Sequence, residues 1–251
     1  MTQPEVSVLQ DVLRLYDHRF LELADDQRRR LVTGTRHVLG ERLADEVRAA
    51  LPAAHRLRAF CIQRGLHAEL ERLIREETEG HRAGAVVVGG RVYAMYPYLR
   101  GVPRHDADIT DEVRVEHRLD ALGWAGGRVR LHGQAAIGQV AAREVAVEVI
   151  LRERATAGER RVGTSPHGSG FEAVIDPAGL GPGSWDVHLA VAAFGLTREA
   201  AFGAVRDARL KTGPRERDGV IVAFGERGDL TIDVPGTRPT PGRLRRLLRR
   251  S

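Results

Sequence analysis

Residues 86–96 read VVVGGRVYAMY, two apolar runs on either side of a Gly-Gly pair. A two-residue hairpin turn needs backbone φ angles above zero, which glycine adopts at little cost. The stretch therefore predicts a β-hairpin that turns at Gly89-Gly90 and ends at Pro97. It also divides the chain, because apolar residues recur at helical spacing before it and at alternating positions after it.

The segment before the hairpin has the pattern of a small helical bundle. Val8, Val12 and Leu15 are spaced as one face of a helix, and further apolar stripes follow up to residue 80. Gly65 fits a C-terminal helix cap. We expect three to five short helices over residues 5–80, with their apolar stripes packed in a shared core.

The segment after the hairpin has the pattern of an antiparallel β-domain. Short alternating runs are separated by Gly and Pro turns. The expected strands are 113–116, 119–124, 128–133, 144–151, 171–175, 185–191, 219–224 and 229–234. Cys61 is the only cysteine, which excludes the antibody-type disulfide but not the sandwich.

The predicted fold class is therefore α+β, a small N-terminal helical bundle followed by an antiparallel immunoglobulin-like β-sandwich. The predicted divisions are a helical linker-like domain, a β-hairpin with its connecting loop, the sandwich and a basic tail, at residues 1–83, 84–110, 111–236 and 237–251.

Positive charge is concentrated at the C-terminus. The chain has 39 basic and 34 acidic residues, and five arginines in the last nine residues account for the excess, since 39 − 5 = 34. A nearly neutral body does not favour nucleic-acid binding. The tail is either a basic amphipathic helix that contacts anionic lipid or polymer, or a solvated segment. Its contact residues are Arg243, Arg245, Arg246, Arg249 and Arg250.

Catalytic and phosphate-binding motifs are not recognised. No Gly-rich phosphate loop occurs, the histidines do not have metal-ligand spacing, and neither a catalytic residue, a metal ligand nor a cofactor is predicted. Asp106-Ala107-Asp108 superficially matches the Asp-X-Asp of many glycosyltransferases, and a solvated turn or a cap is the alternative. Cys61 lies on an apolar helical face and is read as a small buried apolar residue.

Two tryptophans and two histidines are the candidate carbohydrate-binding residues. Indole rings stack on sugar rings, although a sandwich core also uses buried tryptophan. The candidates are Trp124, Trp185, His132 and His188.

The order of segments resembles a known enzyme family. LPAAHRLRAF at 51–60, with Arg64-Gly65 and Glu69-Leu70 after it, resembles the helical linker of family 2 glycosyltransferases of the wall teichoic acid β-glycosyltransferase type. LDALGWAGGRVRLHGQAAI at 119–137 is similar to the first strands of their immunoglobulin-like C-terminal domain, and the resemblance continues through 171–177 and 183–187. It spans about residues 10–235.

This resemblance implies a cytoplasmic enzyme family that works at the inner membrane face and transfers sugars from nucleotide donors to a teichoic-acid-like polymer. The family's catalytic domain precedes the linker, so we expect no donor-site residues here. We expect instead a non-catalytic accessory module for polymer binding or oligomerisation. Alternatives are a protein–protein scaffold, and a glycosyltransferase fragment or metal-dependent enzyme that uses His105, Asp106 and Asp108.

The expected partners are an anionic glycopolymer and either a catalytic glycosyltransferase or a second copy of the chain, without nucleic acid. The expected location is the cytoplasm, with peripheral contact to the inner membrane face through the tail.

Overall fold

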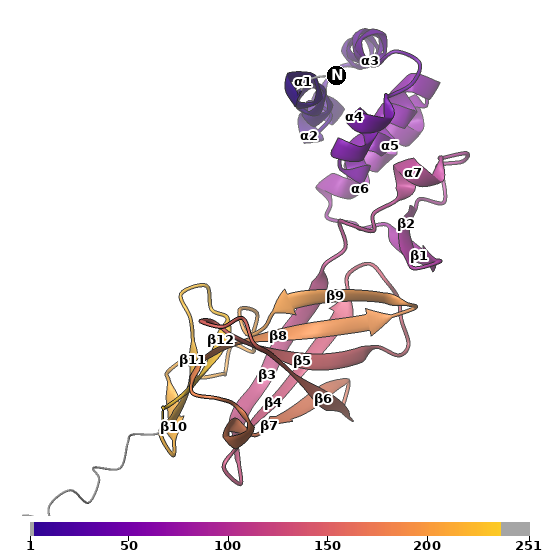
Figure 1. Cartoon of the computed structure of the whole chain (residues 1–251). Helices are drawn as coiled ribbons and strands as arrows, with labels where there is room; N and C mark the ends of the chain where they lie inside the picture. The colour runs from indigo at the N-terminus through magenta and orange to yellow at the C-terminus, as the bar shows by residue number, and fades with distance from the viewer. Residues whose placement is uncertain (1–2, 237–251) are drawn as a thin grey trace, which may run out of the picture. The chain divides into compact units, whose positions relative to one another are not determined.

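The computed structural model describes residues 3–236, and side chains from residue 6 onward. The chain forms two compact units. The helical unit contains residues up to Val113 together with 137–143 and 194–196, and the β unit contains the remaining segments (Figure 1). The prediction of an α+β chain, helical first and antiparallel β afterwards, is confirmed.

Six α-helices precede the first strand within the described residues, which is more than the three to five expected. They are α1 (Gln3–Arg14), α2 (His18–Glu22), α3 (Asp25–Leu39), α4 (Asp45–Ala50), α5 (Ala53–Arg64) and α6 (His67–Thr78). The apolar pattern does not predict α3, because only Val32, Thr35 and Leu39 of its 15 residues are buried. None of the helices described is long and apolar enough to cross a membrane.

Helix α5 is the central helix of this unit, since it contacts α1, α3 and α6. Its C-terminus is capped as predicted by Gly65, which has a left-handed φ of 69°. The stripe expected on α1 is partly wrong, because Val8 and Leu15 are 57% and 56% exposed. Leu13 on α1 and Tyr16 just after the helix are fully buried and pack into the core instead.

The predicted hairpin is present in the helical unit. Strands β1 (Gly84–Val88) and β2 (Arg91–Met95) pair antiparallel, with Val88 opposite Arg91. Gly89 and Gly90 have φ angles of 59° and 74°, as the two-residue turn requires. The short helix α7 (Arg104–Ala107) packs against α5 and β2, which brings the loop after the hairpin onto the helices.

The β unit is one curled antiparallel sheet. Its path runs β10-β11-β12-β8-β5-β6-β7-β4-β3, and β9 pairs with β8 (Figure 1). The strands are β3 (Val115–Ala125), β4 (Arg128–Ile137), β5 (Ala146–Glu153), β6 (Glu159–His167), β7 (Gly170–Ile175), β8 (Gly183–Ala193), β9 (Leu196–Ala201), β10 (Arg215–Arg217), β11 (Val220–Phe224) and β12 (Leu230–Val234).

Strand β6 is the corner of this sheet. Its first half, up to Gly163, pairs with β5, and its second half, from Thr164, pairs with β7. A strand that changes neighbours in this way folds the sheet over its own core. The sequence pattern does not predict β6, because Val162 is its only aliphatic residue. The strands expected at 113–116 and 119–124 are one continuous strand, β3, which begins at Val115.

The predicted domain boundaries stay predictions. The hairpin and its loop belong to the same compact unit as the helices, and that unit continues to Val113. The predicted tail, residues 237–251, lies outside the described residues.

Candidate functional site

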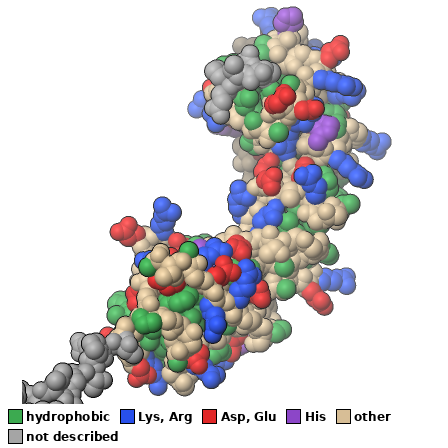
Figure 2. Space-filling view, viewed as in Figure 1, with side chains coloured by type: hydrophobic (Ala, Val, Ile, Leu, Met, Phe, Trp, Pro, Cys, Tyr) green, Lys and Arg blue, Asp and Glu red, His purple; other side chains and the backbone are tan. Residues whose placement is uncertain are grey.

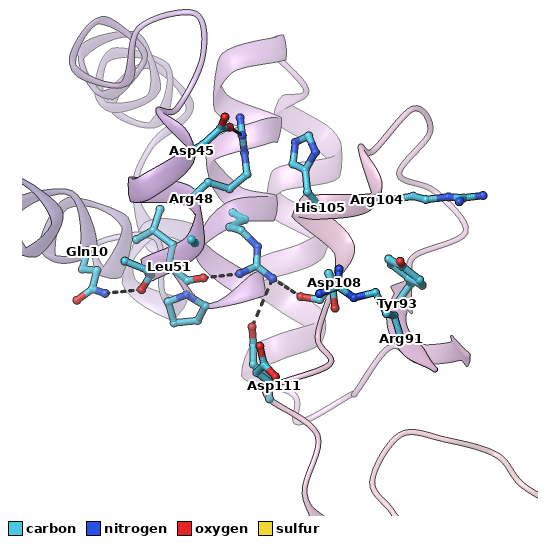
Figure 3. A pocket seen from close by; sticks show the side chains of 15 residues that line it. Gln10, Asp45, Arg48, Leu51, Arg91, Tyr93, Arg104, His105, Asp108 and Asp111 are labelled. Atoms are coloured by element: carbon cyan, nitrogen blue, oxygen red, sulfur yellow. Dashed lines mark hydrogen bonds and ion pairs between the residues drawn. The ribbon is translucent and has the colours of Figure 1, made fainter. Parts of the chain in front are cut away.

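A pocket of about 830 Å³ opens in the helical unit. Its walls come from α4, from the turn between α4 and α5, from β2, and from α7 with the loop that follows. Figure 3 shows Asp45 and Arg48 together on α4, and it shows Arg91, Tyr93 and Arg104 grouped near β2 and α7.

Arg56 lines the pocket but has a structural role. The residue is 8% exposed. Its guanidinium donates to the carbonyl oxygens of Leu51 (2.5 Å), Asp106 (3.3 Å) and Asp108, and it lies 3.5 Å from the carboxylate of Glu112. Leu51 and Asp108 are the C-terminal caps of α4 and α7, where carbonyl oxygens lack intrahelical donors. Arg56 therefore joins two helix ends to α5.

Arg48 is also engaged within the protein. Its Nε lies 3.2 Å from Oδ1 of Asp106, and its guanidinium also pairs with Asp45 and donates to the carbonyl of Leu43 at 3.1 Å. Burial raises the pKa of Asp106, although the nearby His105 and Arg48 oppose the shift. This pair holds α7 against α4 and leaves Arg48 little capacity for an external ligand.

Two other arginines present their charge at the rim. The Arg91 side chain is 63% exposed, with Nη1 3.3 Å from Oδ2 of Asp108. Arg104 is exposed and has no hydrogen-bond or ion-pair partner within the described residues. A guanidinium offers a planar fork of donors that fits phosphate or carboxylate oxygens. Arg91 and Arg104 are thus the pocket residues best placed to contact an anion.

The pocket also contains acidic groups, so its charge is mixed. Arg48, Arg56, Arg91 and Arg104 line it together with Asp45, Asp108, Asp111 and Glu112. On the face of the helical unit drawn in Figure 2, basic and acidic side chains are likewise interspersed. Carboxylates accept hydrogen bonds from hydroxyl groups. The lining therefore suits a ligand that carries hydroxyls as well as negative charge.

The two tryptophans predicted to bind carbohydrate lie in the β unit, on β3 and β8. Trp185 is 8% exposed, and its indole N–H donates to the carbonyl of Gly181 at 2.9 Å. Trp124 is half-buried. Neither residue lines the arginine-rimmed pocket. Their carbohydrate-binding role stays a prediction, and the buried position of Trp185 is the one that a core indole usually takes.

The two predicted histidines lie at different places on the β unit. His188 lines a second pocket, of about 540 Å³, together with Arg154, Asp186 and Asp229. Burial, aided by Arg152, lowers the pKa of His188, so its imidazole is neutral at pH 7. His132 is not part of that pocket, and its Nε2 lies 2.8 Å from the carboxylate of Glu172. The binding role predicted for both histidines is not tested by this placement.

The remaining candidates are the loop residues and the tail. Asp106 is buried against Arg48 rather than placed in a solvated turn, because α7 packs on α5. Asp108 accepts from the backbone N–H of Thr110 at 2.9 Å, which is the capping geometry expected of an Asp turn. The predicted tail contacts lie outside the described residues: Arg243, Arg245, Arg246, Arg249 and Arg250.

The pocket arginines were not predicted from the sequence as site residues. One signal was present, since Arg56 lies on α5 among residues that form its apolar face, next to Leu57 and near Phe60. A charged residue on such a face is buried only when it is paired. The rim residues Arg91 and Arg104 carry no comparable signal, because their proximity depends on how α7 docks.

The comparisons with known proteins concern both units. The family described as the glycosyl transferase TarS linker domain matches residues 8–74. A crystal structure of residues 217–571 of S. aureus TarS is similar at 12% identity and a TM-score of 0.55, covering 93% of this chain and 70% of that chain. A crystal structure of S. aureus TarS is similar at 14% identity and a TM-score of 0.43, covering 78% of this chain and 37% of that chain. No curated protein matches the chain.

The family match and the structure of residues 217–571 of S. aureus TarS confirm the resemblance predicted from the sequence. The family match spans most of the helical unit, from within α1 into α6. At 12% identity, the match to residues 217–571 shows a shared fold. Residues 8–74 therefore match the model of glycosyl transferase TarS linker domains, and the chain continues from them into the β fold found in residues 217–571 of S. aureus TarS.

Proposed function

We propose that the chain is a non-catalytic accessory module associated with glycosyltransferases of teichoic-acid-like polymer synthesis, and that its helical unit binds an anionic glycopolymer. The observation that carries this proposal is the match of residues 8–74 to a glycosyl transferase linker domain, because that domain includes the α4 wall of the pocket, with the exposed Asp45. In this proposal the module works beside such an enzyme, at the inner face of the cell membrane.

The chemistry of the pocket supports this ligand class. A teichoic-acid-like chain carries negative charges and hydroxyl groups. Arg91 and Arg104 offer guanidinium donors to the charges, and Asp45, whose side chain is 95% exposed, accepts from hydroxyls. A volume of about 830 Å³ is within the range of pockets that enclose a small ligand, and so fits a short segment of polymer.

The test is a calorimetric titration of the full chain with a purified teichoic-acid-type polymer at low and high salt. Arg91→Ala and Arg104→Ala should each weaken binding about 5- to 10-fold, or roughly 1–1.4 kcal/mol. Arg100→Ala is the matched control, because Arg100 is exposed in the segment between β2 and α7 and does not line the pocket. It should change the affinity less than about twofold.

Two results would count against polymer binding at this pocket. One is equal affinity for Arg100→Ala and Arg104→Ala, which would indicate general electrostatic attraction. The other is an absence of binding at low salt, where attraction between opposite charges is strongest. Arg91→Ala should leave folding intact, since an exposed ion pair contributes at most about 1 kcal/mol.

A protein–protein scaffold is the second candidate, and exposed apolar residues on the hairpin favour it. Val86, Val88 and Met95 are 40%, 49% and 51% exposed. The register places them on the same face, since Val86 pairs with Tyr93 and Met95 with Gly84. Light scattering of wild-type protein and Val88→Asp over a concentration series tests self-association. A mass that stays monomeric in both would exclude a homomeric scaffold at those concentrations.

A further inference from the structure

Three potential metal ligands from three adjacent strands meet on the surface of the β unit. His132 on β4 lies directly opposite Glu172 on β7. On the other side of β7, Ser165 of β6 is opposite Glu172, and His167 lies two residues further along the same face. Cross-strand and diagonal neighbours on one face are within reach of one another. The ladder therefore directs both imidazoles and the carboxylate to one place.

The three ligand atoms already lie close to the spacing that a shared metal ion would impose on them. Nε2 of His132 lies 2.8 Å from Oε2 of Glu172, and Nδ1 of His167 lies 3.8 Å from the same oxygen. One ligand atom from each of the three residues lies within 4.8 Å of the others. Zinc bonds of about 2.0–2.2 Å in a tetrahedral site place ligand atoms roughly 3.3–3.6 Å apart. Small side-chain rotations would reach that spacing.

The backbone around the cluster leaves little freedom. His167 and Gly170 pair across a tight turn whose Gly168 has a φ of 57°. Strands β4 and β7 approach so closely that a Cβ on Gly170 would lie 2.1 Å from the carbonyl oxygen of Gly133. His132 and Glu172 are thus held by rigid elements, as a preorganised site requires.

Arg130 holds the carboxylate of Glu172 in place. Its Nε and Nη2 donate to Oε2 of Glu172 at 2.9 and 2.5 Å. A carboxylate has about four acceptor positions on its two oxygens, so Glu172 can accept from Arg130 and ligate an ion at the same time. Ligating carboxylates are commonly held by such an outer partner.

We propose that His132, His167 and Glu172 form a binding site for a zinc-class divalent transition-metal ion, with Nε2 of His132 and Nδ1 of His167 as the nitrogen ligands. Two imidazoles and one carboxylate suit zinc better than magnesium or calcium, which prefer oxygen ligands. His167 is 52% exposed at its side chain, so the fourth position opens to solvent and takes water.

The experiment measures zinc binding to the full, tag-free chain by equilibrium dialysis and elemental analysis. We expect one zinc ion per chain with micromolar or tighter affinity and no magnesium binding. His132→Ala, His167→Ala and Glu172→Gln should each weaken zinc binding at least about 10-fold. His167→Cys should restore it, because a thiolate is also a zinc ligand. His188→Ala is the control, since His188 is a histidine of the same unit that lies outside the cluster.

A second readout distinguishes lost ligands from lost folding. Both tryptophans lie in the β unit, so their fluorescence follows its unfolding. Zinc should raise the unfolding midpoint of the wild type and of His188→Ala, but not that of Glu172→Gln. Stoichiometric zinc that remains in all three alanine or glutamine variants would overturn the proposal. An absence of zinc binding to the wild type would also overturn the proposal, and would show that His132, His167 and Glu172 form only an ion-pair network.

Discussion

Replacing Arg56 with methionine tests how the pocket is assembled. The substitution keeps an unbranched apolar side chain on α5 and removes the guanidinium. The carbonyl oxygens of Leu51, Asp106 and Asp108 then lose a donor, and Glu112 loses a cation. We expect the segment around α7 to detach from α5 at lower denaturant concentration.

The magnitude follows from the burial of these groups. Leaving a buried polar group unpaired costs about 1–3 kcal/mol. Three acceptors are affected, and part of the loss is recovered where water reaches the pocket opening. The carboxylate of Glu112, which loses its cation, is 39% exposed, so water solvates it and the lost ion pair adds at most about 1 kcal/mol. We therefore expect Arg56→Met to lower the free energy of unfolding of the helical unit by about 3–5 kcal/mol.

Two optical probes separate the two units in a urea titration. Helices α1–α7 lie in the helical unit, so circular dichroism at 222 nm follows that unit, and the tryptophans follow the β unit. Arg56→Met should shift only the dichroism transition. Arg64→Met on the same helix is the control, since Arg64 is exposed and only stacks 6.0 Å above Phe60. The Arg64→Met variant should lose at most about 1 kcal/mol of the free energy of unfolding. Equal shifts for both variants would refute the structural role of Arg56.

The remaining predictions concern the backbone and one histidine. Gly170→Ala should lower the tryptophan-detected stability by at least about 2 kcal/mol, because its Cβ would lie 2.1 Å from the carbonyl oxygen of Gly133. Gly163→Ala, with nothing within 4 Å of its Cβ, should be nearly neutral, and equal effects would contradict the packing argument. Burial lowers the pKa of His55 from 6.5 to about 4, so as the pH falls the unfolded chain takes up a proton at His55 before the folded chain does. The contribution of His55 to the free energy of unfolding of the helical unit should be fully present above pH 6.5 and be lost toward pH 4. His55→Gln should therefore make the free energy of unfolding fall less steeply between pH 6.5 and 5. An unchanged pH dependence would exclude His55 as a source of the acid sensitivity of the helical unit. Phe194 has a φ of 51°, so Phe194→Asn should raise the melting temperature, and a decrease would show that the aromatic ring has a packing role.

The elements that could be predicted are those with strong local signals. The apolar runs around Gly89-Gly90 predicted their hairpin, because glycine at positive φ is a local requirement. Gly65 likewise marked the end of α5. Strand β6 could not be found in this way, since its pairing with β5 and β7 is a property of the whole sheet.

The candidate site depends on contacts between distant residues, and the sequence does not display them. Arg48 and Asp106 are 58 positions apart and meet only when α7 docks on α5. His132 and Glu172 are 40 positions apart and meet through strand register. Both cases explain why histidine and aspartate spacing along the chain predicted neither the pocket nor the cluster.

Hydrogen exchange of the full chain with and without a teichoic-acid-type polymer tests most directly whether the helical unit binds it. We expect slower exchange in the pocket segments 45–52 and 104–112, and little change in the strands that carry Trp124 and Trp185. Slower exchange confined to those strands would place the polymer site in the β unit. That result would contradict the assignment of binding to Arg91 and Arg104.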